Sequence, residues 1–142
     1  MATYDASVNT NNSVRSNRSY SDLNLNFNKN PATKDVAKLK DVEAVKRAVR
    51  NLILTNRFER PFHPEIGSDI RSLLFENMTP VVEVLLKDRI KETIDVYEPR
   101  ADVTDIIVSG DSDRNEYRVQ IEFRVLNVPN PIVVTEFLQR LR

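Results

Sequence analysis

The hydrophobic pattern of this chain changes its period at Pro99, and this switch constrains the fold more than any other feature. Before Pro99, residues 79–97 carry apolar side chains at the spacing of one helix face. After it, residues 117–125 alternate between apolar side chains and charged or polar ones, which is typical of a strand with one buried face. Because proline disfavours helical backbone in the preceding residue, the helix ends here. We therefore expect a helix that runs directly into a sheet.

Three helices are predicted. Thr79-Pro80 begins the longest, since threonine can accept a hydrogen bond from an early N–H group and proline suits the first helical position. Asp41 can cap an earlier helix that runs to Thr55, and Ser68 can cap a short helix after Gly67. The residues expected on the buried stripes of these helices are Val82, Leu85, Leu86, Ile90, Ile94 and Tyr97, then Val42, Val45, Val49 and Leu52, then Ile70, Leu73 and Leu74.

Three strands are predicted after Pro99, over Val103–Val108, Tyr117–Val125 and Ile132–Gln139. Turn-forming residues separate them at 110–113 and 127–131. A C-terminal helix is the competing interpretation of the last segment, from Glu136, Phe137, Leu138 and Leu141. Together the helices and strands predict an α+β fold, with two main helices and a short one packed on a small antiparallel sheet.

The segment before the first helix is less regular. Leu23, Leu25 and Phe27 alternate with polar residues, which predicts a short strand with one buried face that is a candidate addition to the sheet. Residues 28–40 are expected to form a polar connector. Residues 1–19 are rich in Asn, Ser and Thr and predict a flexible N-terminal arm, so the folded domain is expected to span residues 20–142. In the loop at residues 56–67, Phe58 and Phe62 are expected to anchor the chain to the core.

Composition excludes several classes of function. The 21 basic residues balance the 21 acidic ones, so net charge gives no reason to expect nucleic acid or a membrane as partner. The absence of cysteine excludes disulfides, thiolate zinc sites and cysteine nucleophiles. The 2 glycines leave no phosphate-binding loop, and we expect no cofactor. No apolar run reaches the ~20 residues that cross a bilayer, and we expect a protein made in the cytoplasm.

Neither a metal site nor a catalytic site is indicated. His63 has Glu59 and Glu65 nearby, but Arg57 and Arg60 crowd the same loop and oppose a cation. A carboxylate pair for glycoside hydrolysis is the enzymatic alternative, yet the spacing of the acidic residues singles out no acid and nucleophile; the candidates are Glu59, Glu65, Asp69 and Glu76. The basic run of Arg47, Arg50, Arg57 and Arg60 favours a solvated face or a protein contact over nucleic acid.

Glu98-Pro99-Arg100 is the most specific polar motif. If the chain is extended there, Glu98 and Arg100 point to the same side, because side chains alternate along a strand. The pair has two functional interpretations: it clasps a complementary pair on a partner, or it braces its own helix–strand corner. A plain helix stop with exposed charges is the third interpretation.

At these residues the chain resembles the baseplate wedge proteins of contractile phage tails, the sheath-initiator family, which includes a counterpart in type VI secretion baseplates. The resemblance covers about residues 20–140. The segments that carry it are Tyr20-Ser21-Asp22-Leu23, Arg60-Pro61-Phe62-His63-Pro64-Glu65-Ile66-Gly67, Leu74-Phe75-Glu76-Asn77-Met78-Thr79-Pro80 and Tyr97-Glu98-Pro99-Arg100.

The resemblance implies a structural protein of the virion, located in the tail baseplate. It implies contacts with the core bundle of larger wedge subunits, with the tail sheath subunit, and with the tail tube or hub. It also implies a sheet like the interlocking part of the sheath subunit, whose strand edges start sheath polymerisation. The residues expected to bind partners are Glu98, Pro99 and Arg100 at the corner, and Ile132, Val133, Val134, Phe137, Leu23 and Leu25 at strand edges.

Two alternatives stay open from the sequence. Members of this family are also labelled tail lysozymes, so a peptidoglycan-degrading enzyme is the main alternative. A cytoplasmic α+β adaptor unrelated to phage is the other.

Overall fold

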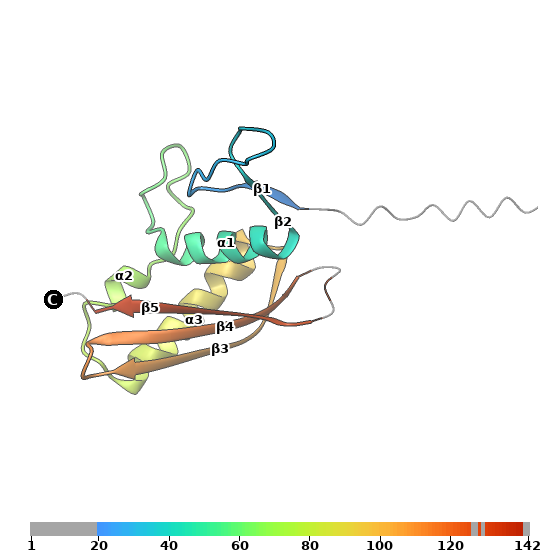
Figure 1. The fold of residues 1–142 in the computed structure, drawn as a ribbon. Coiled ribbons are helices and arrows are strands. Elements are labelled where there is room, and N and C mark those ends of the chain that lie inside the picture. The colour runs from blue at the N-terminus through green and yellow to red at the C-terminus, as the bar shows by residue number, and fades with distance from the viewer. Residues whose placement is uncertain (1–19, 126–127, 129, 141–142) are drawn as a thin grey trace, which may run out of the picture.

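A computed structural model describes residues 20–125, 128 and 130–140, and the predicted arm at 1–19 and part of the predicted turn at 127–131 lie outside them (Figure 1). The described residues form three helices and two antiparallel sheets, which confirms the α+β class. The elements are β1 (Ser21–Leu23), β2 (Lys38–Lys40), α1 (Asp41–Leu54), α2 (Ile70–Leu73), α3 (Pro80–Tyr97), β3 (Ala101–Asp111), β4 (Glu116–Val125) and β5 (Ile132–Gln139).

The larger sheet is an antiparallel meander in the order β3-β4-β5. Its central strand β4 has the predicted alternation, and Ile121 on its buried face lies opposite Ile106 of β3 and Val134 of β5. The segment 132–139 is a strand, so the competing helix is wrong. A bulge between Val103 and Asp105 shifts the register of β3, which moves its buried positions from odd to even residue numbers. The predicted turn lies slightly later, because Gly110 and Asp111 still belong to β3.

Two helices cover one face of this sheet. The helix α3 packs on β3, while α1 contacts both α3 and β5 (Figure 1). Thr79 caps α3 as predicted, since its Oγ1 accepts a hydrogen bond from Val82 N at 3.4 Å. The buried residues between the helices and β4 include Val45, Val49, Leu86, Ile90, Ile94, Tyr117, Val119, Ile121 and Phe123. Leu85 is an exception to the predicted stripe, because 46% of it is exposed. No described helix is both long enough and apolar enough to cross a membrane.

Two predicted caps are wrong. Asp41 is the first residue of α1, and its Oδ1 accepts a hydrogen bond from Tyr20 N at 3.0 Å instead of capping the helix. The Ser68 hydroxyl donates to the carbonyl of Ile53 at 2.6 Å, so it joins the end of α1 to the start of α2. Each side chain therefore forms a hydrogen bond with a backbone group of another segment, instead of capping its own helix.

The predicted strand with a buried face at Leu23–Phe27 is also wrong. The strand β1 ends at Leu23 and pairs with β2 in a separate sheet, so it is not added to the meander. The strand β2 belongs to residues 28–40, where the sequence predicts a polar connector without a strand. Leu23, Leu25 and Phe27 are all more than half exposed. The alternation breaks because Asn24 makes a turn, in which its Oδ1 accepts from Asn26 N at 3.0 Å.

Candidate partner-binding site

The corner between α3 and β3 is closed by an ion pair. Glu98 ends α3, its backbone carbonyl accepts from Ala101 N at 3.0 Å, and only 6% of the residue is exposed. Arg100 binds the Glu98 carboxylate through two nitrogens, Nε at 2.5 Å and Nη2 at 2.8 Å. The expectation that the two side chains lie together is confirmed. Of the two functional interpretations, this contact supports the internal brace of the helix–strand corner, because the buried Glu98 is already paired within its own chain.

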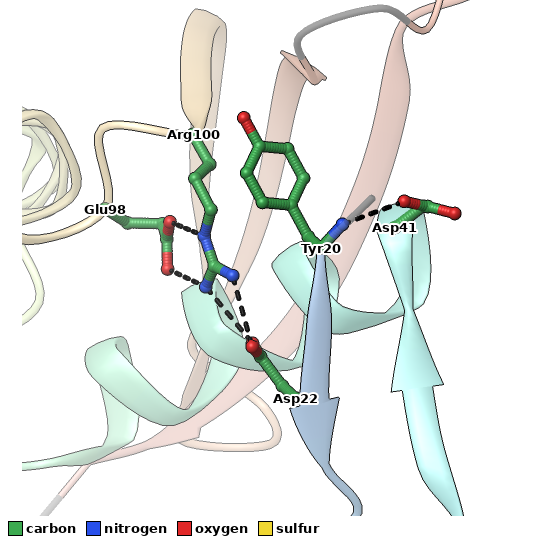
Figure 2. Close-up of polar contacts among 5 residues, drawn as sticks. All are labelled: Tyr20, Asp22, Asp41, Glu98 and Arg100. Carbon is green, nitrogen blue, oxygen red and sulfur yellow. Dashed lines mark hydrogen bonds and ion pairs between the residues drawn. The ribbon is translucent and has the colours of Figure 1, made fainter. Parts of the chain in front are cut away.

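Arg100 also reaches β1, as Figure 2 shows. Its Nη1 and Nη2 donate to the two carboxylate oxygens of Asp22 at 3.3 and 3.2 Å, and its guanidinium lies 5.4 Å from the centre of the Tyr20 ring. The bonds to Glu98 first, and to Asp22 second, raise the pKa of Arg100 above its usual value, so it stays charged. We call Asp22, Glu98, Pro99 and Arg100 the charged corner.

Sequence reasoning missed Asp22 as a functional residue. It lies 78 positions before Arg100. No periodicity or spacing links residues so far apart. The available signal was Tyr20-Ser21-Asp22-Leu23, one of the segments that carry the family resemblance, but it suggested no partner for the carboxylate.

A groove of about 550 Å³ opens beside the charged corner. Small side chains of α1, Ala44 and Ala48, form part of its lining, together with the more polar Arg47 and Asn51. Other lining residues come from three parts of the chain: Leu23 and Leu25 from the β1 side, Arg60 and Ile66 from the loop at 56–67, and Glu98 and Arg100 from the corner. The structure therefore brings four of the predicted site residues, Leu23, Leu25, Glu98 and Arg100, to one surface.

The predicted residues of β5 lie elsewhere and divide between the two faces of the sheet. Val133 and Phe137 face outward and are about half exposed, at 54% and 50%. Val134 is buried and Ile132 packs against the core, so neither side chain is free for a partner. Phe137 lies beside Arg118 of β4, with 5.3 Å from the guanidinium carbon to the ring centre. Within the described residues, β5 pairs only with β4, so it forms an edge of the sheet.

The motif at 75–80 joins the start of α3 to the end of β5. Arg140 donates from Nε to the carbonyl of Glu76 at 2.9 Å and from Nη2 to Asn77 Oδ1 at 2.9 Å. At the same end of the sheet, the Glu83 carboxylate accepts from Gly110 N at 2.8 Å. These bonds fix the position of α3 against the sheet.

Two of the acidic residues considered for catalysis form hydrogen bonds with near neighbours in the sequence. Glu59 accepts two hydrogen bonds from Asn56, and Glu65 accepts one from His63 at 3.2 Å. Among the residues that the structure describes, no group of three or more His, Asp and Glu side chains is arranged to hold a metal ion.

Comparisons with known proteins identify the family. The model of the family "Baseplate wedge protein gp25" matches residues 40–130. A relative, baseplate wedge protein gp25 of Enterobacteria phage T4, is 34% identical over 116 residues, which cover 82% of this chain and 87% of the relative. This chain belongs to the baseplate wedge protein gp25 family. It is therefore a structural component of a contractile-tail baseplate, as the resemblance implied.

Solved structures agree with this membership. A chain of the anti-feeding prophage baseplate matches with a TM-score of 0.69 and 28% identity over 79% of this chain and 90% of that one. A chain of the post-contraction pyocin R2 baseplate matches with a TM-score of 0.56 and 15% identity, over 83% and 98%. A protein of Geobacter sulfurreducens described as a putative tail lysozyme matches with a TM-score of 0.66 and 21% identity, over 70% and 91%. At 15% and 21% identity the last two show the fold alone.

Proposed function

We propose that this chain is a non-catalytic wedge subunit that nucleates sheath polymerisation by accepting a strand of the sheath subunit at β5. The observation that carries the proposal is the outer edge of β5, whose backbone N–H and C=O groups have no ladder partner within the described residues. An open edge favours pairing with another extended chain, and alternate side chains then select the partner. Val133 and Phe137 supply exposed apolar area beside that edge.

We further propose that the groove beside the charged corner receives helices of the larger wedge subunits, the core bundle. Ala48 of α1 is a small, partly exposed side chain in the groove and allows a partner helix to approach closely. Arg47 supplies positive charge at the groove for acidic side chains of that helix. In this proposal Glu98 and Arg100 shape the wall of the groove, and the pair contributes rigidity more than free charge.

Proline substitution tests strand addition. Two prolines at alternate residues of 132–139 whose N–H groups point away from β4 remove edge donors but keep the β4–β5 ladder. Baseplates with this variant should assemble and carry no sheath. Alanine at the same two positions keeps both N–H groups and is the matched control. Normal sheaths on the proline variant would refute strand addition at β5, and lost baseplates with a folded variant would assign the edge to wedge assembly.

The enzymatic alternative is tested directly. The purified chain should leave peptidoglycan intact in a turbidity assay. Clearing that is lost when one of the candidate carboxylates, such as Glu59 or Glu76, is changed to the amide would establish the tail-lysozyme activity instead.

A further inference from the structure

The loop at residues 56–67, here called the aromatic loop, displays two phenylalanine rings to solvent. Phe58 is 84% exposed and Phe62 is 95% exposed, so the prediction that they anchor the loop to the core is wrong. Both residues have backbone in the left-handed region, with φ of 68° and 69°. A bulky residue is a genuine outlier there, and such strain persists only where the surrounding structure imposes it. The loop therefore bears two separate costs, strained backbone and exposed apolar area.

The surrounding structure holds the aromatic loop in one shape. Phe58 N donates to the carbonyl of Pro64 at 2.8 Å, which closes the loop upon itself. The hydroxyl of Tyr97, at the end of α3, donates to the carbonyl of Glu65 at 2.7 Å. At the base, Gly67 has φ of 151°, and a Cβ there would lie 2.6 Å from the backbone of Asn56. The rings are thus presented from a fixed frame and not from a floppy segment.

The charges around the rings indicate what they meet. The carboxylate of Glu59 accepts hydrogen bonds from Asn56, and that of Glu65 accepts one from His63. The bonds from Asn56 and, to a smaller extent, the nearby Arg71 lower the pKa of the Glu59 carboxyl. By contrast, the exposed side chains of Arg57 and Arg60 make no hydrogen bond or ion pair to any residue that the structure describes. The surface therefore offers two exposed rings beside two arginines that can pair with carboxylates of a partner.

We propose that the aromatic loop docks into a pocket on another baseplate protein, apolar at its floor and lined with carboxylates at its rim. Buried aromatic and arginine side chains supply most of the binding energy in protein interfaces, where they act as anchors. A bilayer rewards apolar area whatever its orientation, so it gives no reason to fix both rings in strained backbone. A shaped protein pocket does give that reason, because rigid presentation reduces the entropy lost on binding. This contact goes beyond the proposed function and uses neither β5 nor the lining residues of α1.

The experiment separates the rings from the backbone. Asparagine is several-fold enriched in the left-handed region, so F58N/F62N keeps the loop geometry and removes both rings. In a phage lacking its own copy of this gene, the complementing double variant should be folded but incorporated into purified tails at least about tenfold less than the unmodified chain. The tyrosine variant F58Y/F62Y keeps the rings and is the matched control, with incorporation close to normal.

A crosslink identifies what the ring touches. The photoreactive residue benzoyl-phenylalanine at position 62 should crosslink, in intact baseplates, to a different baseplate protein within a patch that combines apolar and acidic residues. A crosslink to a second copy of this chain or to lipid, or normal incorporation of F58N/F62N, would overturn the proposal. The chain has no cysteine, so F62C gives a single thiol; it should react quickly with a maleimide in the free protein and slowly in tails. Equal rates in both would also overturn it.

Discussion

The charged corner and the aromatic loop reverse the ordinary placement of side chains. At the corner, Glu98 and most of Arg100 are removed from solvent, whereas in the loop Phe58 and Phe62 are almost wholly in it. Globular proteins rarely bury charges unless they are paired, and rarely expose several aromatic rings without a use. The corner is complete within the chain, because every charge has a partner. The loop is complete only with another molecule. The comparison indicates which of the two motifs holds the fold and which one is displayed on the surface.

The largest effect on stability is expected from removing the Arg100 guanidinium at the charged corner. Arg100→Ala leaves Glu98 buried without its counter-charge, and breaking a buried pair in this way costs about 3–5 kcal/mol of unfolding free energy. Because Arg100 retains 24% side-chain exposure, we expect the lower end of that range. Chemical denaturation measures it. Arg100→Lys keeps the positive charge but loses the bidentate geometry of the guanidinium, so it should lower the unfolding free energy by less than Arg100→Ala. An alanine variant as stable as the parent would show that the corner is not a brace.

The second-largest effect on stability is expected at Gly67, at the base of the aromatic loop. Gly67→Ala places a Cβ 2.6 Å from backbone atoms of Asn56, in a φ region that only glycine adopts readily. We expect a loss of about 2–3 kcal/mol, since the backbone itself must move. Gly110→Ala is the control, because its Cβ would meet the flexible end of Met78 at 2.8 Å. Equal losses in thermal unfolding for the two variants would contradict the special role of Gly67.

The third prediction has the opposite sign. Phe62→Asn removes an exposed ring from strained backbone, so the free chain should become about 0.5–1 kcal/mol more stable. The gain is measured by thermal unfolding of the isolated protein. A ring that anchored the core would give a loss of more than about 2 kcal/mol on removal, and such a result would reverse our placement of Phe62.

The smallest effect is a pH dependence of the aromatic loop. The hydrogen bonds from the Asn56 side chain and backbone lower the pKa of Glu59 below its usual 4.5. Because the folded pKa is the lower one, this contribution is present above pH 4.5 and is lost as pH falls through the folded value. The protection factor of the Asn56 N–H group, which corrects for the intrinsic pH dependence of amide exchange, should fall across that window. Glu59→Gln should abolish the dependence, while dependence that persists in this variant would assign it to another carboxyl group.

The sequence predicted the elements whose pattern is local. Thr79-Pro80 and Pro99 bound α3 as expected, and the alternation in β4 identified its buried face, because each signal is contained within a few residues. The segment 132–139, predicted as a candidate edge strand, does lie at one end of the order β3-β4-β5.

The failures share a physical cause. Leu23, Leu25, Phe27, Phe58 and Phe62 are hydrophobic, and the sequence assigned them to the interior, but side-chain chemistry gives no information about strain or local turns. Phe27, Phe58 and Phe62 all have positive φ, which no propensity for phenylalanine suggests. Asp22 was missed because its contact with Arg100 depends on tertiary structure alone.

The bond between Arg100 and Asp22 has a consequence for the order in which the chain folds. It closes a segment of 78 residues, so β1 gains this anchor only after the ribosome has delivered residue 100. Closing a long segment costs conformational entropy that later contacts must offset, and such contacts form late. The hairpin of β1 and β2 can contact α1 earlier, through the bond from Tyr20 N to Asp41, but a chain that stalls before Arg100 lacks the second anchor, at Asp22.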